Sequence, residues 1–279
     1  MNLDRICEAT GALSARRGDR IQSLWSGYGE VVRVHLEGAA FETVIVKHVC
    51  PPAIAHPRKI RSYEVERAWY SDWSARCTPA CRVPTCFASW SDGRESTFVL
   101  EDLDAAGFPL RKRYLSDRDL DSCLRWLAHF HATFLHNPPT GLWEVGTYWH
   151  LATRPDELQA MGDLALKRLA PELDRQLNSA RFQTLVHGDA KPANFCFALD
   201  GSGVSAVDFQ YVGGGCGMKD VAYLLGRESP EKWLGRYFSH FRIAMGEGGV
   251  SEAVAVEREW RGLFEVAQRD FARFLDGWR

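Results

Sequence analysis

The sequence lacks the features that mark several large classes of protein. No stretch approaches the roughly 18 consecutive apolar residues of a transmembrane helix, and the first twenty residues carry scattered charges where a signal segment would be apolar. Clusters of lysine and arginine are also missing, and 34 basic against 36 acidic residues give a formal net charge of −2. We therefore expect a cytoplasmic protein with no membrane span and no nucleic-acid partner.

The eight cysteines contain no Cys-x-x-Cys pair. Cys77, Cys81 and Cys86 lie close together in the chain, but their spacing matches no common zinc pattern and no pair of histidines follows them. Several of the other cysteines stand in apolar segments, where a thiol behaves as a small hydrophobic group. We expect reduced and mostly buried thiols.

The first hundred residues read as strands with one helix. Strand patterns cover residues 20–25, 31–36 and 41–49, and two more strands, 82–90 and 95–102, flank an Asp-Gly hairpin turn. Residues 58–76 contain no glycine or proline and suit a surface helix. A five-stranded antiparallel sheet with one helix follows as the expected structure of residues 1–101.

From residue 102 to 279 the pattern is mainly helical. A helix is expected after a cap at Ser116, another over 156–181 with a break at Pro171, and two more over 230–245 and 252–278. Small strands interrupt them at 185–189, 194–199 and 204–209. The chain is thus predicted to be α+β, with a division between residues 1–101 and 102–279.

The most informative motif lies among these small strands. His187, Asp189, Lys191 and Asn194 occur within eight residues, and Asp208 follows fourteen positions after Asn194. Phosphoryl transfer requires a carboxylate beside the acceptor hydroxyl and oxygen ligands for magnesium, which these residue types supply. A hairpin between Asn194 and Asp208 would bring both to one metal, His187 would brace the loop, and Lys191 could neutralise charge on the transferred group.

The segments HGDAKPAN and VDFQ resemble the aminoglycoside phosphotransferase and choline kinase superfamily, and SYEVERAWY and FVLEDLDAAGF are similar to its ecdysteroid-kinase-like branch. The resemblance implies a bilobal, protein-kinase-like fold that uses ATP and Mg²⁺ to phosphorylate a hydroxyl group of a small molecule. It also implies that Asp189 is the catalytic base and that Asn194 and Asp208 bind the metal. Gln210 stands where many members of the superfamily carry a second acid, and this difference would weaken a second magnesium site.

The nucleotide site follows from the same resemblance. Lys47 ends a strand and can reach the α- and β-phosphates, while Ile45, on the same face, would cover the adenine. A helix glutamate should pair with the lysine, and Glu66 matches the family pattern better than Glu64.

Backbone groups around the nucleotide are expected from two further places. Gly27 and Gly29 in the first turn would let amides approach phosphate, although a plain turn explains them nearly as well. Glu101 and Leu103, between the lobes, would face the adenine edge. Asp220 is predicted to cap a helix, and in the family the matching aspartate buttresses the catalytic loop.

The acceptor site is the least defined by the sequence. Two aromatic groups are candidates for its wall: Trp143, Tyr148 and Trp149 in one segment, and Trp233, Tyr237, Phe238 and Trp260 near the C-terminus. Three histidines on one predicted helix, His129, His131 and His136, are expected to pack or lie on the surface, not to bind metal.

Three other functions compete with a metabolite kinase. An antibiotic phosphotransferase is disfavoured because no acidic cluster is evident that would grip a polycation. The expected acceptor is instead a hydroxylated metabolite, an amino alcohol or a sterol-like alcohol. A regulatory pseudokinase is disfavoured because the lysine, base and metal ligands are all present, and a protein kinase because no activation segment follows Asp208.

Overall fold

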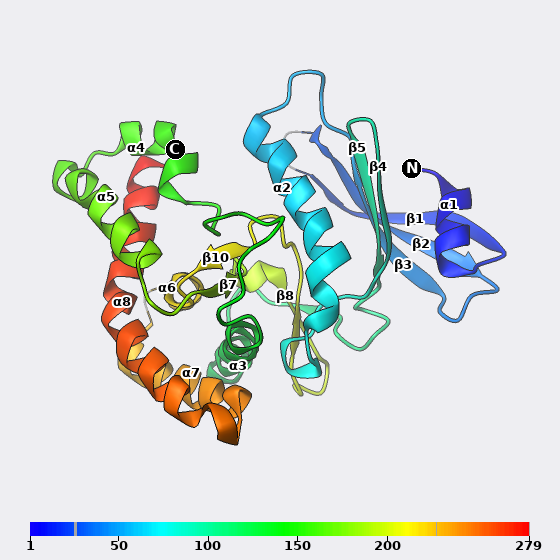
Figure 1. The fold of residues 1–279 in the computed structure, drawn as a ribbon. Helices are drawn as coiled ribbons and strands as arrows, with labels where there is room; N and C mark the ends of the chain where they lie inside the picture. The colour runs from blue at the N-terminus through cyan, green and yellow to red at the C-terminus, as the bar shows by residue number, and fades with distance from the viewer. Residues whose placement is uncertain (25–26, 227, 279) are drawn as a thin grey trace.

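A computed structural model describes residues 1–24, 27–226 and 228–278. Figure 1 shows a strand-rich half and a helix-rich half side by side, with α2 (Pro57–Ala68) on the inner side of the sheet. Within the described ranges, none of the helices combines the length and apolar character needed to cross a bilayer. The mixed α+β architecture agrees with the prediction.

The sheet is antiparallel and has the five predicted strands in the order β1-β2-β3-β5-β4. The strands are β1 (Ser14–Ser23), β2 (Gly29–Glu37), β3 (Thr43–Val49), β4 (Cys86–Asp92) and β5 (Glu95–Glu101). Strand β1 begins six residues before the predicted strand, and residue 25 of that prediction lies outside the described residues.

A helix at the N-terminus, α1 (Leu3–Thr10), was not predicted from the sequence. Asn2 caps it by accepting a hydrogen bond from the backbone N–H of Arg5, and Ile6 is its one buried side chain. Eight residues give too short a pattern for helical periodicity to stand out.

The predicted helix over 58–76 forms as α2 and continues through a π-helical turn, Trp69–Trp73, and a short 3₁₀ turn, Ser74–Arg76. Its buried face carries Tyr63, Val65, Trp69 and Trp73. Trp69 and Trp73 lie four positions apart, close to one helical turn, so both tryptophans stay on the buried side of the helix.

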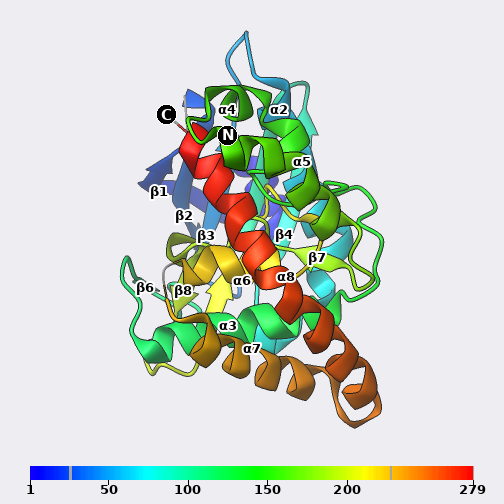
Figure 2. The ribbon, with the colours of Figure 1, turned by 90° about the vertical axis from the view of Figure 1, so that its left-hand side faces the viewer.

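The helix-rich half contains six α-helices among the described residues and five short strands. The helices are α3 (Asp117–Thr133), α4 (Pro155–Ala160), α5 (Leu164–Asn178), α6 (Met218–Leu225), α7 (Pro230–Met245) and α8 (Val250–Gly277). The strands are β6 (Leu110–Arg111), β7 (Thr184–Val186), β8 (Phe195–Phe197), β9 (Val204–Ala206) and β10 (Gly213–Gly215). Figure 2 shows α8 running across this half, where it packs on α4, α5, α6 and α7.

One helix prediction was wrong. Residues 156–181 form two helices, α4 and α5, and Pro171 lies inside α5 without ending it. The break comes earlier because the Asp163 carboxylate accepts hydrogen bonds from the N–H groups of Ala165 and Leu166 and so starts a new helix. Asp276 fixes the preceding turn by accepting from the N–H groups of Gly162 and Asp163.

The prediction that the C-terminal aromatic residues form a wall of the acceptor site was also wrong. Trp233, Tyr237, Phe238 and Trp260 are at most 2% exposed and belong to the main hydrophobic core. They fill the space between α3, α7 and α8, so they stabilise the helix-rich half and cannot contact a substrate.

Candidate active site

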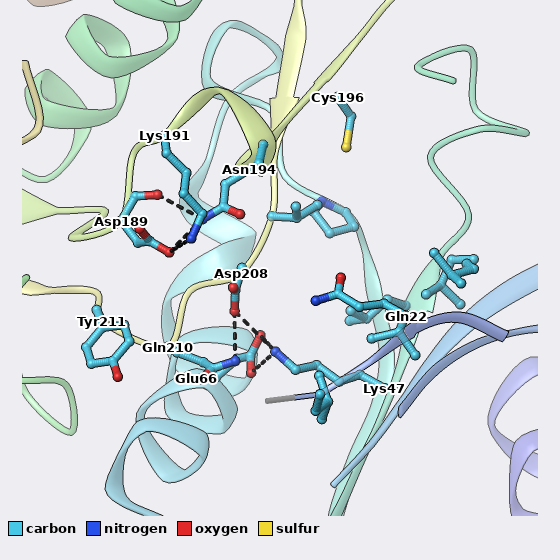
Figure 3. Close-up of a pocket in the computed structure, with 18 of the residues that line it drawn as sticks. Gln22, Lys47, Glu66, Asp189, Lys191, Asn194, Cys196, Asp208, Gln210 and Tyr211 are labelled. Carbon is cyan, nitrogen blue, oxygen red and sulfur yellow. Dashed lines mark hydrogen bonds and ion pairs between the residues drawn. The ribbon is translucent and has the colours of Figure 1, made fainter. Parts of the chain in front are cut away.

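A cavity of about 1050 Å³ lies between the sheet and the helix-rich half. Its lining comes from β1, β2, β3, α2, the segment after β5, the loops around β8 and β9, and the end of α8. Nine of the residues predicted for the site line it, namely Ile45, Lys47, Glu66, Glu101, Leu103, Asp189, Lys191, Asn194 and Asp208. Figure 3 shows six polar members of this set around the cavity: Lys47, Glu66, Asp189, Lys191, Asn194 and Asp208.

Lys47 and Glu66 form a buried ion pair. The Lys47 Nζ lies 2.8 Å from Oε1 and 2.7 Å from Oε2 of Glu66, and the two side chains are 8% and 1% exposed. Glu64 instead points outward and pairs with Arg61 on the surface of α2. Burial would lower the pKa of Lys47, but the carboxylates of Glu66 and Asp208 outweigh burial and raise that pKa, so the lysine is charged.

Asp208 stands where β9 ends, with a left-handed φ of 69° that turns its carboxylate into the cavity. Its Oδ1 accepts hydrogen bonds from Lys47 Nζ at 3.2 Å and from the Gln210 amide at 2.8 Å. Gln210 in turn accepts a hydrogen bond from the Ser62 hydroxyl of α2 at 3.2 Å. Burial acts to raise the pKa of Asp208, but the charges of Lys47 and Lys191 hold it below its ordinary value.

Asp189 lies at the centre of the loop after β7. Its Oδ2 accepts from Lys191 Nζ at 2.7 Å and from Asn194 Nδ2 at 3.0 Å, and its Oδ1 accepts from the Tyr223 hydroxyl at 3.2 Å. Burial raises the pKa of this carboxyl, and Lys191 opposes the shift. The three donors fix the rotation of the carboxylate.

His187 and Gly188 shape the loop from behind. His187 Nδ1 accepts from the Asp189 N–H, and its Nε2 donates to the Val207 carbonyl, which joins the two loops of the site. Gly188 has a φ of 80°, and a Cβ there would stand 2.2 Å from the Tyr211 carbonyl oxygen. Only glycine fits this position.

The buried Asp220 accepts hydrogen bonds from the N–H groups of His187 at 2.6 Å and Gly188 at 2.9 Å. The prediction that it caps a helix was wrong, because Gly217 is the residue at the start of α6 and Asp220 lies in the first turn. These two hydrogen bonds support the loop before Asp189, which is the buttressing role that the family resemblance implied for Asp220. His131, buried on α3, completes it with a hydrogen bond to Asp220 at 3.2 Å.

Two oxygen atoms in the cavity suit a magnesium ion. Asn194 uses its Nδ2 to bind Asp189, and Asp208 uses Oδ1 to accept from Lys47 and Gln210. Across the part of the chain that the structure describes, Asn194 Oδ1 and Asp208 Oδ2 have no hydrogen-bond partner. Mg²⁺ in kinases is held by one or two such side chains together with substrate phosphates, so the donor set fits the ion.

No three histidine, cysteine, aspartate or glutamate residues cluster as metal ligands anywhere in the described ranges, and Cys77, Cys81 and Cys86 are free thiols.

The glycines of the first turn lie apart from the cavity. Neither Gly27 nor Gly29 is among its described lining residues. Gly29 has a φ of 135°, and a Cβ there would meet the His48 carbonyl oxygen at 2.0 Å, so β-strand pairing accounts for this glycine. Tyr28 between them is buried, and its hydroxyl accepts from the His56 N–H.

The end of the cavity beyond Asp189 contains residues that the sequence analysis missed: Arg58, Lys59, Arg154, Tyr211, Phe274, Leu275 and Trp278. Of the predicted segment wall, only Tyr148 lines the cavity. Trp149 is buried and donates to Asp270, and Trp143 donates to the Gln210 carbonyl. Lys59 lies two helical turns before Glu66, so the spacing along the helix could have placed both side chains on one face. The other missed residues come together only through tertiary packing.

The sequence model of the phosphotransferase enzyme family matches residues 20–253 of the chain. Among solved structures, the aminoglycoside phosphotransferase APH(3'')-Id from Streptomyces rimosus, in complex with ADP and streptomycin, is 16% identical, with 92% of each chain covered and a TM-score of 0.51. The same enzyme in another structure gives 14% identity, 99% of this chain and 96% of that chain covered, and a TM-score of 0.53.

The microcompartment-associated aminopropanol kinase is 16% identical, with 94% of this chain and 90% of that chain covered and a TM-score of 0.51. At these identities the likeness shows the fold, and it agrees with the bilobal, protein-kinase-like architecture expected from the sequence. No curated protein matches the chain significantly.

Proposed function

The chain belongs to the phosphotransferase enzyme family and is a small-molecule kinase, and from this premise we propose that it transfers the γ-phosphoryl group of ATP to a hydroxyl group. The observation that carries the proposal is the convergence of Lys47, Asp189 and Asp208 on one cavity. A lysine held by a buried glutamate, a fixed carboxylate and a second carboxylate open to the cavity are the groups that phosphoryl transfer uses.

In the proposed reaction, the acceptor oxygen attacks the γ-phosphorus while Asp189 accepts the hydroxyl proton. The bond from the γ-phosphorus to its bridging oxygen breaks, and ADP leaves. Lys191 and Tyr223 orient the Asp189 carboxylate, and Lys191 can also neutralise charge on the transferred group.

The residues proposed for nucleotide binding come mainly from residues 1–101. Lys47 would contact the α- and β-phosphates with Glu66 fixing its position, and Ile45, Glu101 and Leu103 would enclose the adenine. Mg²⁺ when bound would neutralise the phosphate charge, and Asn194 and Asp208 are the residues that would hold it. Residues 102–279 would then supply the base and the acceptor site.

The test uses ADP release from Mg·ATP with a panel of small alcohols. Asp189→Asn should lower kcat by about 100-fold or more, the usual contribution of a general base, while leaving ADP affinity nearly unchanged. Asp208→Asn should remove the magnesium dependence of ADP binding. Full turnover in Asp189→Asn would refute the assigned base, and tight ATP binding without turnover on the panel would favour a regulatory pseudokinase.

A further inference from the structure

Three cationic side chains converge at the acceptor end of the cavity. Arg58 and Lys59 come from the first turn of α2, and Arg154 comes from the segment before α4. Arg58 joins the two segments by donating a hydrogen bond to the Thr153 carbonyl at 2.6 Å. The two arginines lie near each other: burial lowers the pKa of Arg154, and the charge of Arg58 lowers it further.

Two of these cations have no carboxylate partner. All six acidic residues that line the cavity are paired with a lysine or arginine: Glu66, Glu101, Asp102, Asp104, Asp189 and Asp208. In the described part of the chain, Arg58 and Lys59 form no ion pair, and the Arg58 Nε is buried without any hydrogen-bond partner. Buried donors of this kind are costly unless a ligand satisfies them.

Arg154 is held rigidly beside them. It is 4% exposed, pairs with Glu157 at 2.8 Å, and stacks its guanidinium over the rings of Tyr148, Phe274 and Trp278 at 5.2 to 5.7 Å. Glu157 does not line the cavity, so it adds no acid to this end.

The cations lie on the acceptor side of the site. Figure 3 shows Tyr211 on the same side of Asp208 as Asp189, and Cys196 and Gln22 on the other side. Tyr211 and Tyr148, which lies against it, line the cavity together with Arg154.

From this arrangement, and resting on the proposed function, we propose that the acceptor is an alcohol that also carries a carboxylate or phosphate group, bound by Arg58, Lys59 and Arg154. Its hydroxyl would face Asp189, its anionic group would meet the three cations, and the rings of Tyr148, Tyr211 and Trp278 would cover its carbon skeleton. The reaction then joins the acceptor oxygen to the γ-phosphorus, gives the proton to Asp189 and releases ADP. A polycationic acceptor would face repulsion here.

The test titrates simple anions into the full chain saturated with Mg²⁺ and a non-hydrolysable ATP analogue. Inorganic phosphate and malonate serve as probes at constant ionic strength, and binding is followed by the unfolding temperature. Lys59→Gln removes an unpaired cavity cation, and Arg168→Gln makes the same charge change on α5 at an exposed residue outside the cavity.

We expect the wild type and Arg168→Gln to be stabilised equally and saturably, and Lys59→Gln to bind about tenfold more weakly or worse, as loss of a charged hydrogen bond implies. A response to phosphate alone indicates a phosphorylated acceptor, and a response to malonate alone indicates a carboxylated one. No response, or equal responses in all three proteins, overturns the proposal. A parallel titration without the ATP analogue is the control: a response seen only there assigns the cations to the nucleotide and also overturns the proposal.

A second measurement compares two alcohols of one skeleton, 4-(hydroxymethyl)benzoate and 4-(hydroxymethyl)benzylamine. The ratio of their kcat/KM values should favour the benzoate and fall in Lys59→Gln but not in Arg168→Gln. A preference for the amine overturns the proposal, and if neither is phosphorylated the anion titration decides. Binding of the ATP analogue is recorded in every variant, so an intact nucleotide site with no anion response leaves the proposed function standing.

Discussion

At the scale of single residues, the loop that carries Asp189 depends on one backbone conformation that side chains exclude. Gly188 combines a positive φ with a close approach to the Tyr211 carbonyl, and its N–H is bound by Asp220. The loop is therefore fixed from both sides, and Asp189, the next residue, takes its position from it.

Gly188→Ala should lower the free energy of unfolding by about 2 kcal/mol or more, because the strained φ and the steric clash both oppose the folded state. Denaturant unfolding measures the change. Gly235→Ala is the matched control: Gly235 lies inside α7 with nothing within 4 Å of the added methyl group, so this change should stabilise by about 0.5–1 kcal/mol. Equal effects of the two changes would contradict the proposed strain.

Lys59 should give anion binding a dependence on pH. Burial lowers the pKa of its ammonium group, Arg58, Arg154 and Lys47 add to the shift, and Asp208 opposes it. The folded state thus binds this proton less tightly than the unfolded chain, so stability without anion should rise with pH below the ordinary pKa of 10.5.

Over the same pH range sulfate, which does not titrate there, should bind more weakly as pH rises, because the lysine loses its charge. Titrations of sulfate from neutral to alkaline pH measure this, and Lys59→Gln should show a flatter profile. A wild-type profile as flat as that of the variant would exclude Lys59 as the titrating group.

At the scale of elements, α2 contributes residues to both proposed ends of the cavity, the nucleotide end and the acceptor end. Lys59, Ser62 and Glu66 lie one turn apart along the helix. Lys59 faces the proposed acceptor end of the cavity, Ser62 donates a hydrogen bond to Gln210, and Glu66 pairs with Lys47. A shift of α2 along its axis would move all three contacts together.

The sequence predicted a helix break at Pro171, but the helix continues through it, and this leads to a stability prediction. Pro171 is exposed inside α5, where it lacks the N–H that would bind the carbonyl four residues earlier. Pro171→Ala should raise the free energy of unfolding by about 1–3 kcal/mol, measured by denaturant unfolding. Pro155→Ala, at the first position of α4, should bring no such gain, because proline suits that position. A loss of stability in Pro171→Ala would mean that the helix requires the kink.

At the scale of the whole molecule, the cavity takes residues from both halves of the fold. Lys47 and Glu66 come from β3 and α2, and Asp189 and Asp208 come from the loops of the helix-rich half. The ion pair of Lys47 and Asp208, with 3.2 Å between Nζ and Oδ1, directly joins the two halves. A ligand in the cavity would touch both halves at once.

Mg·ADP should therefore stabilise the chain as one unit. At about 100 times its Kd it should raise the free energy of unfolding by about 2.7 kcal/mol, in a single transition followed by circular dichroism and by tryptophan fluorescence. Asp208→Asn should lose the part of this gain that depends on magnesium. Two separate transitions, only one of them shifted by Mg·ADP, would show that the halves unfold independently.

The sequence by itself determined the local arrangements. The period of β3 put Ile45 and Lys47 on one face, and the short hairpin of β8 and β9 returned Asp208 to Asn194, because backbone geometry fixes neighbours within a few residues. The family resemblance favoured Glu66 over Glu64 as the partner of Lys47, and the structure decided between them.

Tertiary structure alone decided which residues form the proposed acceptor site. Arg58 and Arg154 are nearly a hundred residues apart, and Trp278 is more than a hundred residues further along the chain, yet all three line one end of the cavity. The aromatics Trp233 and Trp260 look equally suited to a binding wall in the sequence, but packing of α7 and α8 buried them. Which apolar and charged side chains face a cavity depends on how the elements pack against one another, and that information is absent from local spacing.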